Sequence, residues 1–245
     1  MPNEYDQGKY IITKVYSRNN YIPRPPIANI DKLLIVFAPV PQPDLLLIDK
    51  LIIYALKNNI EPILVVNKKD IAPIELINDL KEQYKDYKLF VVSAKQGDNI
   101  DVIKEYISGC ICAVCGQSAV GKSSLLNALI PNFNLQTQEL SRKIDRGKHT
   151  TRVNELYLCD GLMIADTPGF SSLELDIEYN ELEEYYPEFE HYLGTCRYLD
   201  CSHIKEGKDC QICRAVEKGE INTQRYNRYI ELYNKLKKDW EEKYD

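Results

Sequence analysis

The sequence predicts an α/β fold, with a parallel sheet covered by helices on both faces and a smaller helical domain after it. Two observations carry this prediction. Short, continuous apolar runs alternate with longer amphipathic segments through the first 176 residues, which is typical of strands that are buried on both faces. Beyond residue 176 these runs stop, and the sequence becomes acidic and aromatic with a cysteine cluster inside it. We therefore expect a domain boundary there.

The expected elements follow one another as strand, helix, strand. Apolar runs predict strands over residues 33–37, 63–66, 89–92, 111–115 and 162–165. Apolar residues that recur with helical spacing predict helices over residues 44–58, 74–87, 99–107 and 122–130. The chain then divides into an N-terminal segment (1–27), an α/β domain (28–176) and a helical domain (177–245).

Composition excludes several classes of protein. The chain has 245 residues, of which 44% are hydrophobic and 28% charged, enough for one or two domains with a real core. A formal charge of −6 argues against a basic, nucleic-acid-coating protein. No apolar run approaches the ~18 residues of a membrane span, and residues 1–10 lack the basic start and apolar stretch of a secretory signal. We expect a cytoplasmic monomer that does not bind membranes.

The strongest motif lies between the strand at 111–115 and the helix at 122–130, and it fits the phosphate-loop pattern G-x-x-x-x-G-K-[ST]. Its glycines let backbone N–H groups turn toward phosphates, and the helix N-terminus adds partial positive charge. Lys122 is placed to neutralise the β and γ phosphates, and the Ser123 hydroxyl to ligate Mg²⁺. The residues expected at the nucleotide are Gly116, Gln117, Ser118, Ala119, Val120, Gly121, Lys122, Ser123 and Ser124.

A second loop, Asp166-Thr167-Pro168-Gly169, follows the strand at 162–165. Ligands of open α/β sheets bind at the carboxyl ends of the strands. There Asp166 is expected to hold Mg²⁺ through water, and the Gly169 amide to sense the γ-phosphate. Together with the phosphate loop, this motif predicts the second half of a nucleoside triphosphatase site.

Two further loops select the base. They are Asn67-Lys68-Lys69-Asp70, after the strand at 63–66, and Ser93-Ala94-Lys95, after the strand at 89–92. The Asp70 carboxylate accepts from both the ring N–H and the exocyclic amine of guanine, whereas adenine would leave a charge unpaired. Asn67 is expected at the other base edge, the Lys68 stem over the ring face, and the Ala94 amide at the guanine carbonyl oxygen. The predicted ligands are GTP and GDP.

The order of these motifs is unusual. In common GTPases the phosphate loop comes first and the guanine-reading loops last, but here the phosphate loop follows the two guanine-reading loops. A sheet tolerates such a change when the old chain ends lie close together. The sequence therefore predicts a circularly permuted P-loop GTPase domain. Its Asp166–Gly169 loop runs directly into the C-terminal domain, so we hypothesise that hydrolysis moves that domain.

A group of soft ligands marks the C-terminal domain. Three cysteines and a histidine lie close together in the sequence, a donor set that matches the closed shell of structural zinc. A metal would also supply a constraint that a small domain needs in order to fold. The predicted ligands are Cys196, Cys201, His203 and Cys210, and Cys213 is an alternative for the fourth position.

The permuted motif order, the segment Gly147-Lys148-His149-Thr150-Thr151 and the Cys-Cys-His-Cys cluster resemble the RsgA/YjeQ family of small-subunit-dependent ribosomal GTPases. The resemblance covers residues 9–245. It implies a zinc-carrying GTPase that binds the 30S subunit and its 16S rRNA late in assembly and is stimulated by that subunit. It also implies an N-terminal OB-fold domain, of which residues 1–27 would be a remnant, either because the domain is truncated or because it is naturally absent.

The resemblance also bears on catalysis. Phe170 stands where many GTPases carry a water-orienting Gln, so the chain resembles the hydrophobic-substituted GTPases. His149 is the candidate to orient or deprotonate the attacking water, and an exposed loop histidine is the alternative. Thr151 is expected to give Mg²⁺ its second hydroxyl beside Ser123 and Asp166, and Lys122 completes the expected catalytic set.

Two basic features are candidates for contact with RNA, and the sequence does not decide whether they make it. One is the stretch at residues 142–148. The other is a row on the last helix, which either meets RNA phosphates or is merely solvated and consists of Arg225, Arg228, Lys235 and Lys238. Two other function classes also stay open: a GTP-gated RNA- or protein-binding module with vestigial hydrolysis, and a generic P-loop ATPase or kinase.

Overall fold

The computed structural model describes residues 13–23, 26–130, 155–166, 173–204 and 209–244. Its centre is a six-stranded sheet of order β5-β4-β3-β6-β8-β7. The strands are β3 (Lys32–Phe37), β4 (Glu61–Val66), β5 (Lys88–Val91), β6 (Ile111–Cys115), β7 (Glu155–Cys159) and β8 (Leu162–Asp166). All neighbouring strands are parallel except the β7–β8 pair. The predicted α/β class is confirmed.

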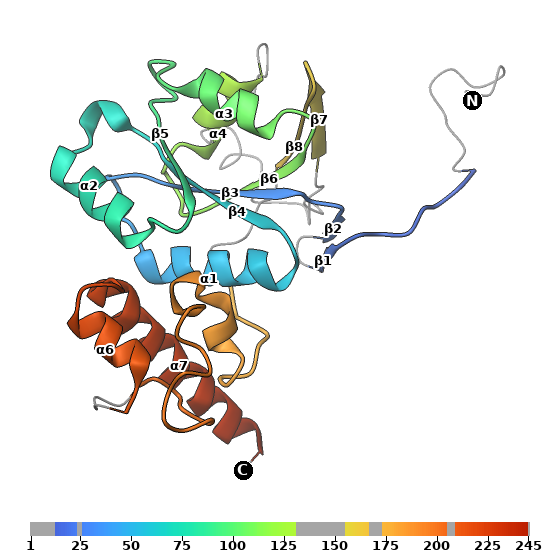
Figure 1. Ribbon diagram of the computed structural model, residues 1–245. Helices are drawn as coiled ribbons and strands as arrows, with labels where there is room; N and C mark the ends of the chain where they lie inside the picture. Colours follow the sequence, from blue (N-terminus) through green and yellow to red (C-terminus); the bar gives the residue numbers. More distant parts are fainter. Residues whose placement is uncertain (1–12, 24–25, 131–154, 167–172, 205–208, 245) are drawn as a thin grey trace.

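Helices cover both faces of this sheet (Figure 1). One face carries α1 (Leu45–Lys57) and α2 (Ile74–Gln83), and the other carries α3 (Ile100–Ile107) and α4 (Lys122–Leu129). Asp44 begins α1, because its side chain accepts a hydrogen bond from the Leu47 amide at 2.9 Å. The prediction for α2 was too long: the helix ends at Gln83, and the Tyr84 side chain turns into the core, where it is 1% exposed.

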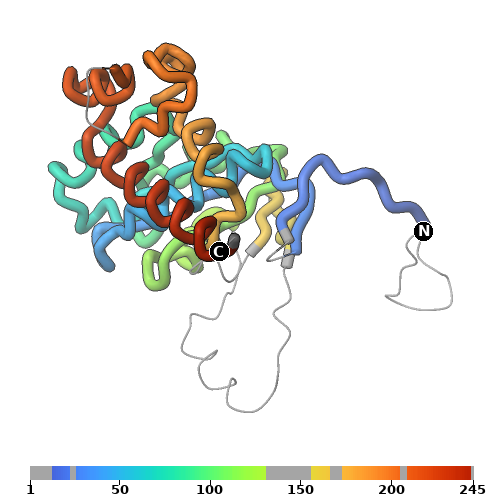
Figure 2. The backbone as a smooth tube through the Cα atoms, turned by 90° about the horizontal axis from the view of Figure 1, so that it is seen from below, coloured from blue at the N-terminus to red at the C-terminus, as the bar shows by residue number. Residues whose placement is uncertain are grey.

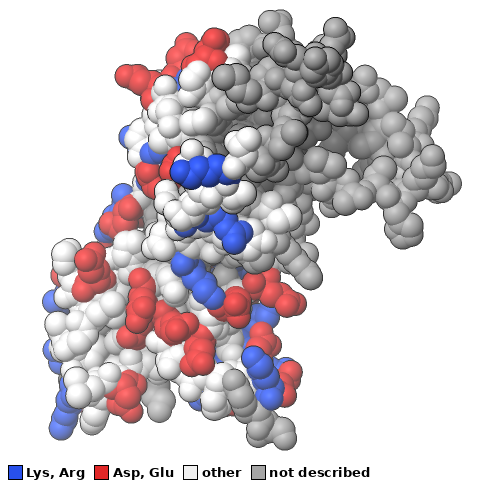
Figure 3. Space-filling model, turned by 90° about the vertical axis from the view of Figure 1, so that its right-hand side faces the viewer, with Lys and Arg blue, Asp and Glu red and all other residues white. Residues whose placement is uncertain are grey.

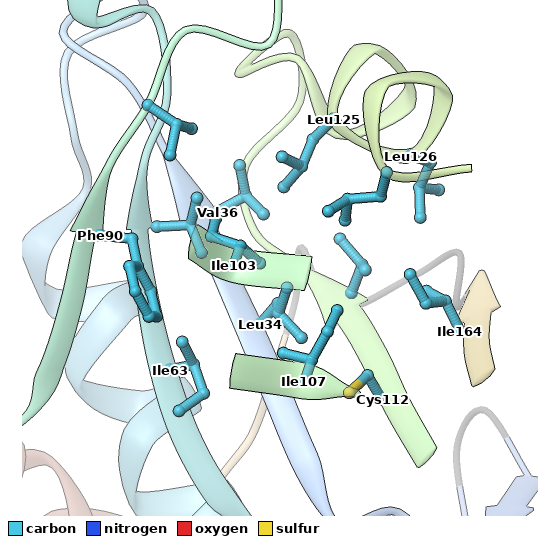
Figure 4. Close-up of a cluster of buried hydrophobic side chains, with 14 of the residues drawn as sticks. Leu34, Val36, Ile63, Phe90, Ile103, Ile107, Cys112, Leu125, Leu126 and Ile164 are labelled. Carbon is cyan, nitrogen blue, oxygen red and sulfur yellow. The ribbon is translucent and has the colours of Figure 1, made fainter. Parts of the chain in front are cut away.

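The core beneath α3 and α4 is built mainly from apolar side chains. Figure 4 shows Ile103 and Ile107 of α3 and Leu125 and Leu126 of α4 with their side chains directed toward those of the strands. Because every central strand is buried on both faces, the strands read as continuous apolar runs, and this is why the sequence predicted them so closely.

Strand β7 was not predicted. It pairs antiparallel with β8 through a turn at Asp160-Gly161, where both residues have positive φ (47° and 80°). An Asp-Gly pair between two apolar runs is a strong hairpin signal, and it was available in the sequence. β7 is an edge strand with alternating side chains, so Leu158 is 71% exposed while Tyr157 packs on the core. A run of this kind has a weaker apolar signal than a central strand.

Two short strands, β1 (Tyr21–Pro23) and β2 (Pro26–Ala28), form a separate antiparallel pair. They lie at the end of the predicted N-terminal segment, and Ile22, the middle residue of β1, is fully buried against the α1 side of the sheet. Residues 1–12 of that segment are outside the described residues.

The C-terminal part contains the 3₁₀ turns η3 (Leu182–Tyr185) and η4 (Pro187–Phe189) and the helices α6 (Gln211–Glu217) and α7 (Thr223–Tyr244). No strand occurs in residues 173–204 or 209–244. This part has its own aromatic core, and it lies against the α1 side of the sheet domain (Figures 1 and 2). Among the described helices, none combines the length and the apolar character that crossing a membrane requires.

Candidate functional site

The predicted nucleotide loops lie at one edge of the sheet. Since β4, β5, β6 and β8 run parallel, their carboxyl ends meet at the same edge. Residues 67–70 follow β4, residues 93–95 follow β5 just beyond Val92, and the phosphate loop at 116–121 lies between β6 and α4. Asp166 is the last residue of β8 and pairs with Val114 of β6.

Asn67 joins three of these loops through one side chain. Its Nδ2 donates to the carbonyl oxygens of Val120 (3.0 Å) and Gly121 (3.3 Å), and its Oδ1 accepts from the Ala94 amide (3.0 Å). The side chain is 2% exposed. We predicted that the Asn67 side chain and the Ala94 amide both contact the base. In the structure the Ala94 amide donates to Asn67 Oδ1, so the Asn67 side chain also holds the loops together.

Lys68 makes a second bridge. The residue has a positive φ of 60°, and its Nζ donates to the carbonyl oxygens of Ala119 (2.8 Å) and Val40 (2.6 Å). The side chain therefore extends from the guanine-reading loop over the phosphate loop to the loop after β3. Lys69 instead points to Asp98, with 3.6 Å between the charged atoms.

Asp70 is exposed, and one of its carboxylate oxygens is fixed. Ser93 Oγ donates to Asp70 Oδ1 at 2.6 Å. This hydrogen bond is the main reason why the pKa of Asp70 is lowered, and the charges of Lys95 and Lys68 lower it further. The carboxylate is therefore ionised at neutral pH, as the acceptor of two guanine N–H groups must be.

The two glycines of the phosphate loop are required by their neighbours. Gly116 has φ 128°, and a Cβ there would lie 1.9 Å from the carbonyl oxygen of Val36. Gly121 has φ 94°, and a Cβ there would lie 2.4 Å from Asn67 Nδ2. Both positions combine a left-handed backbone with no room for a side chain.

Lys122 begins α4 and folds back onto the loop that precedes it. Its Nζ donates to the carbonyl oxygens of Gly116 (2.9 Å) and Gln117. The ammonium group is thus held on the loop's own backbone, where it can neutralise a phosphate oxygen. Ser123, the predicted Mg²⁺ ligand, follows in the first turn of α4.

Three predicted residues lie outside the described part of the chain: His149, Thr151 and Gly169. Of the three Mg²⁺ ligands expected, the structure therefore places Ser123 and the backbone of Asp166 only.

The predicted metal ligands come together in the C-terminal part. The ligand atoms of Cys196, Cys201, His203 and Cys210 lie within 4.8 Å of one another. The Cys196 Sγ–His203 Nδ1, Cys210 Sγ–His203 Nδ1 and Cys196 Sγ–Cys210 Sγ distances are 3.6, 3.5 and 3.9 Å. A tetrahedral zinc site with S and N bonds of normal length has ligand separations of about 3.6–3.8 Å. Thiols and imidazole in this arrangement fit zinc.

The residues around these four ligands also favour metal binding. His203 Nε2 lies 2.9 Å from a carboxylate oxygen of Glu183, an arrangement that directs the Nδ1 lone pair toward the thiols. Burial lowers the pKa of His203, which favours the neutral, ligating imidazole. The amides of Gln211 and Cys213 donate to the sulfurs of Cys196 (3.3 Å) and Cys210 (3.4 Å). Sequence reasoning missed Glu183, because nothing in its local sequence marks it.

Cys213, the alternative fourth ligand, points elsewhere. Its sulfur lies 3.2 Å from the Tyr226 hydroxyl, and Cys213 is not among the four clustered ligands. Cys210 instead takes two roles, because it is also the N-cap residue of α6.

The prediction of a basic row on the last helix is wrong for Arg225 and Arg228, because both arginines are paired with carboxylates inside the protein. Arg225 is 1% exposed and its Nε donates to Glu188 (2.7 Å), and Arg228 Nε donates to Asp49 (2.6 Å). Only Lys235 and Lys238 of that row are exposed. On the face shown in Figure 3, the lower part of the molecule carries acidic as well as basic side chains. The row therefore does not form a continuous surface for RNA phosphates.

A family model described as RsgA GTPase matches residues 15–176. The chain belongs to the RsgA GTPase family. It is 41% identical over 233 residues to the "Small ribosomal subunit biogenesis GTPase RsgA" of Clostridium acetobutylicum, covering 94% of this chain and 81% of that protein. It is 43% identical over 231 residues to the protein of the same name from Ruminiclostridium cellulolyticum, covering 92% of this chain and 75% of that protein.

Solved structures agree with the RsgA family. YjeQ from Thermotoga maritima superimposes with a TM-score of 0.79 at 36% identity, covering 91% of this chain and 77% of that one. YloQ, described as a circularly permuted GTPase, gives 0.75 at 33% identity, covering 92% and 75%. The predicted circular permutation is thereby confirmed, and as an RsgA GTPase the chain is a GTP hydrolase.

Proposed function

We propose that this chain binds and hydrolyses GTP at the loop edge of its sheet and acts in late maturation of the small ribosomal subunit, which stimulates it. The nucleotide site is supported above all by the hydrogen bonds of Asn67. Its buried side-chain amide binds the phosphate loop on one side and the Ala94 amide on the other. The ribosomal role is supported by the relatives named small ribosomal subunit biogenesis GTPase.

In this proposal each loop has a separate task. Asp70, fixed by Ser93, accepts the two N–H groups that distinguish guanine. The amides of the phosphate loop and Lys122 bind the phosphate oxygens, and Gly169 senses the γ-phosphate. Ser123, Thr151 and Asp166 would hold Mg²⁺, which neutralises charge on the β and γ phosphates.

Hydrolysis needs an oriented water. The Phe170 side chain has no polar atom for this task, so we assign it to His149, whose imidazole can accept a proton from water at neutral pH. Lys122 stabilises the charge that develops on the phosphates as the bond to the γ-phosphate breaks. Completion of the site on the subunit would then account for stimulation.

The metal cluster would hold one structural zinc. It joins the loop that carries Cys196, Cys201 and His203 to the start of α6 at Cys210. Four protein ligands leave no open coordination position, so the role of the ion is to fix the C-terminal part. We further propose 16S rRNA as the contact on the subunit and a monomeric protein in the cytoplasm, where subunits mature.

The test is GTP turnover by this chain with and without purified 30S subunits. A stimulated rate supports the proposal. Tight GTP binding with a rate that 30S subunits leave unchanged would favour the alternative, a GTP-gated binding module with vestigial hydrolysis. Competition of ATP with GTP for the site would point instead to a generic P-loop ATPase or kinase.

A further inference from the structure

Helix α1 is buried on two opposite sides. Four of its apolar residues pack into the sheet core, and on the opposite side Ile53 belongs to the aromatic core of the C-terminal part; the four are Ile48, Leu51, Ile52 and Ala55. A helix that is apolar around most of its circumference is packed on more than one side. Figure 1 shows α1 between the sheet above it and α6 and α7 below it.

The N-terminal end of α1 is tied to the nucleotide loops. Gln117, the second residue of the phosphate loop, accepts a hydrogen bond from the Asp44 amide (3.0 Å) and donates to the Gln42 carbonyl oxygen (3.3 Å). Asp44 is the N-cap of α1. Lys68 adds a contact from the guanine-reading loop to Val40, in the same connection between β3 and α1.

The middle of α1 is tied to α7. Asp49 is fully buried, and each of its carboxylate oxygens has an arginine partner: Arg225 donates to Oδ1 and Arg228 to Oδ2 (2.6 Å). The Tyr84 hydroxyl donates to Oδ1 as well (2.7 Å). Arg228 also donates to Gln83 Oε1 at 2.9 Å, which extends the contact to α2.

The charges in this group balance. Two carboxylates, Asp49 and Glu188, face two guanidinium groups, Arg225 and Arg228. Burial by itself lowers the pKa of Arg225, and the two carboxylates more than offset it. Buried pairs of this kind are a weak source of net stability, but their directional hydrogen bonds specify one relative position of the elements that they join.

We propose that α1 couples the phosphate loop to the C-terminal part, with Gln117 holding its N-terminal end and the Asp49–Arg225–Arg228 group holding α7. The inference rests on the proposed GTP site. It gives a route to the metal-bearing part other than the chain segment that follows β8. A helix of 13 residues transmits a shift of its end as a rigid rod.

The chain provides its own reporter for α7. Trp240 is the single tryptophan, is 38% exposed, and packs edge-on against Tyr179 with 5.7 Å between ring centroids. It lines a groove of about 680 Å³ together with Lys50 of α1 and Leu175 of the segment that follows β8. A displacement of α7 relative to α1 therefore changes the surroundings of the indole ring.

The experiment compares Trp240 fluorescence of the full chain with GDP and with a non-hydrolysable GTP analogue. We expect a difference between the two states in the wild type. In Arg228→Gln we expect that difference to fall at least about threefold, because a substitution along the residues that couple two sites changes the coupling on about this scale. The affinity for the analogue should stay the same. Lys237→Gln, on the exposed side of α7, is the matched control and should keep the wild-type difference.

A second variant guards against simple loss of folding. Arg228→Lys keeps the charge toward Asp49 but cannot make the second contact with Gln83, so it should fold and show a reduced difference. A purely structural role predicts a lower melting temperature with the nucleotide difference intact, which would overturn the coupling, as would a wild type that binds nucleotide without any Trp240 response. Absence of nucleotide binding, measured with a fluorescent GDP, would instead overturn the proposed function.

Discussion

Asn67 is the residue whose replacement best tests the arrangement of the site. The Asn67→Ala change removes three hydrogen bonds, two to the phosphate-loop carbonyls and one from the Ala94 amide. Each is worth about 1 kcal/mol net, so the expected loss of unfolding free energy is about 3 kcal/mol. For a domain of this size each kcal/mol lowers the melting temperature by about 2–4 °C, which predicts a drop of about 6–12 °C.

The Asn67→Asp variant separates shape from hydrogen bonding. It retains an acceptor for the Ala94 amide but turns a carboxylate oxygen toward the carbonyls of Val120 and Gly121. The oxygen that faces the two carbonyls is buried and has no hydrogen-bond donor, so the pKa of this new carboxyl in the folded state is raised above its unfolded value. Stability is therefore lost as the pH rises through the folded pKa and is regained on acidification, when the protonated carboxyl donates again.

Thermal unfolding between pH 5 and 7 measures both effects, and binding of a fluorescent GDP measures the site. We expect both variants to bind GDP more weakly than the wild type, and Asn67→Asp to approach the wild-type melting temperature only at the acidic end. Asn58→Ala, which loses one part-buried contact to the Tyr54 carbonyl oxygen, is the control. If Asn67→Ala melts within about 2 °C of the wild type and binds GDP equally well, Asn67 does not join the loops.

Three further outcomes are expected. Asp70→Asn should weaken GTP and favour xanthosine triphosphate, because the amide then donates to the extra xanthine oxygen; unchanged base selectivity would contradict the assignment. Elemental analysis should find one zinc per chain in Cys213→Ala and none in Cys210→Ser, and the opposite pattern would exchange their roles. His149→Ala should keep GTP affinity and lower turnover stimulated by the 30S subunit, and an unchanged stimulated rate would remove His149 from the mechanism.

The sheet could be read from the sequence because its central strands are buried on both faces. The predicted run at 111–115 coincides with β6, those for β3, β4 and β8 differ by one or two residues at one end, and that for β5 is displaced by one residue. Loop motifs at the ends of parallel strands must meet at one edge, so the position of the site was predictable as well. β7 was missed because half of its side chains face solvent.

Side-chain partners were less accessible to sequence reasoning. The helical spacing of Arg225 and Arg228 correctly places them on one face of the helix. That this face is buried and not exposed depends on its contact with Asp49, which is far away in the chain. The same holds for Ala94, whose amide binds Asn67. Cys210 and Cys213 are three residues apart, and only the folded chain distinguishes them, because Cys210 joins the ligand group while Cys213 contacts Tyr226.

One sulfur atom has two structural duties. Cys210 Sγ lies in the metal cluster and also accepts the Cys213 amide that opens α6. Ion release would therefore free the first turn of that helix to fray, and refolding of the turn would restore a ligand. Metal affinity and helix order at this point are one equilibrium, which chelation would displace toward the frayed helix.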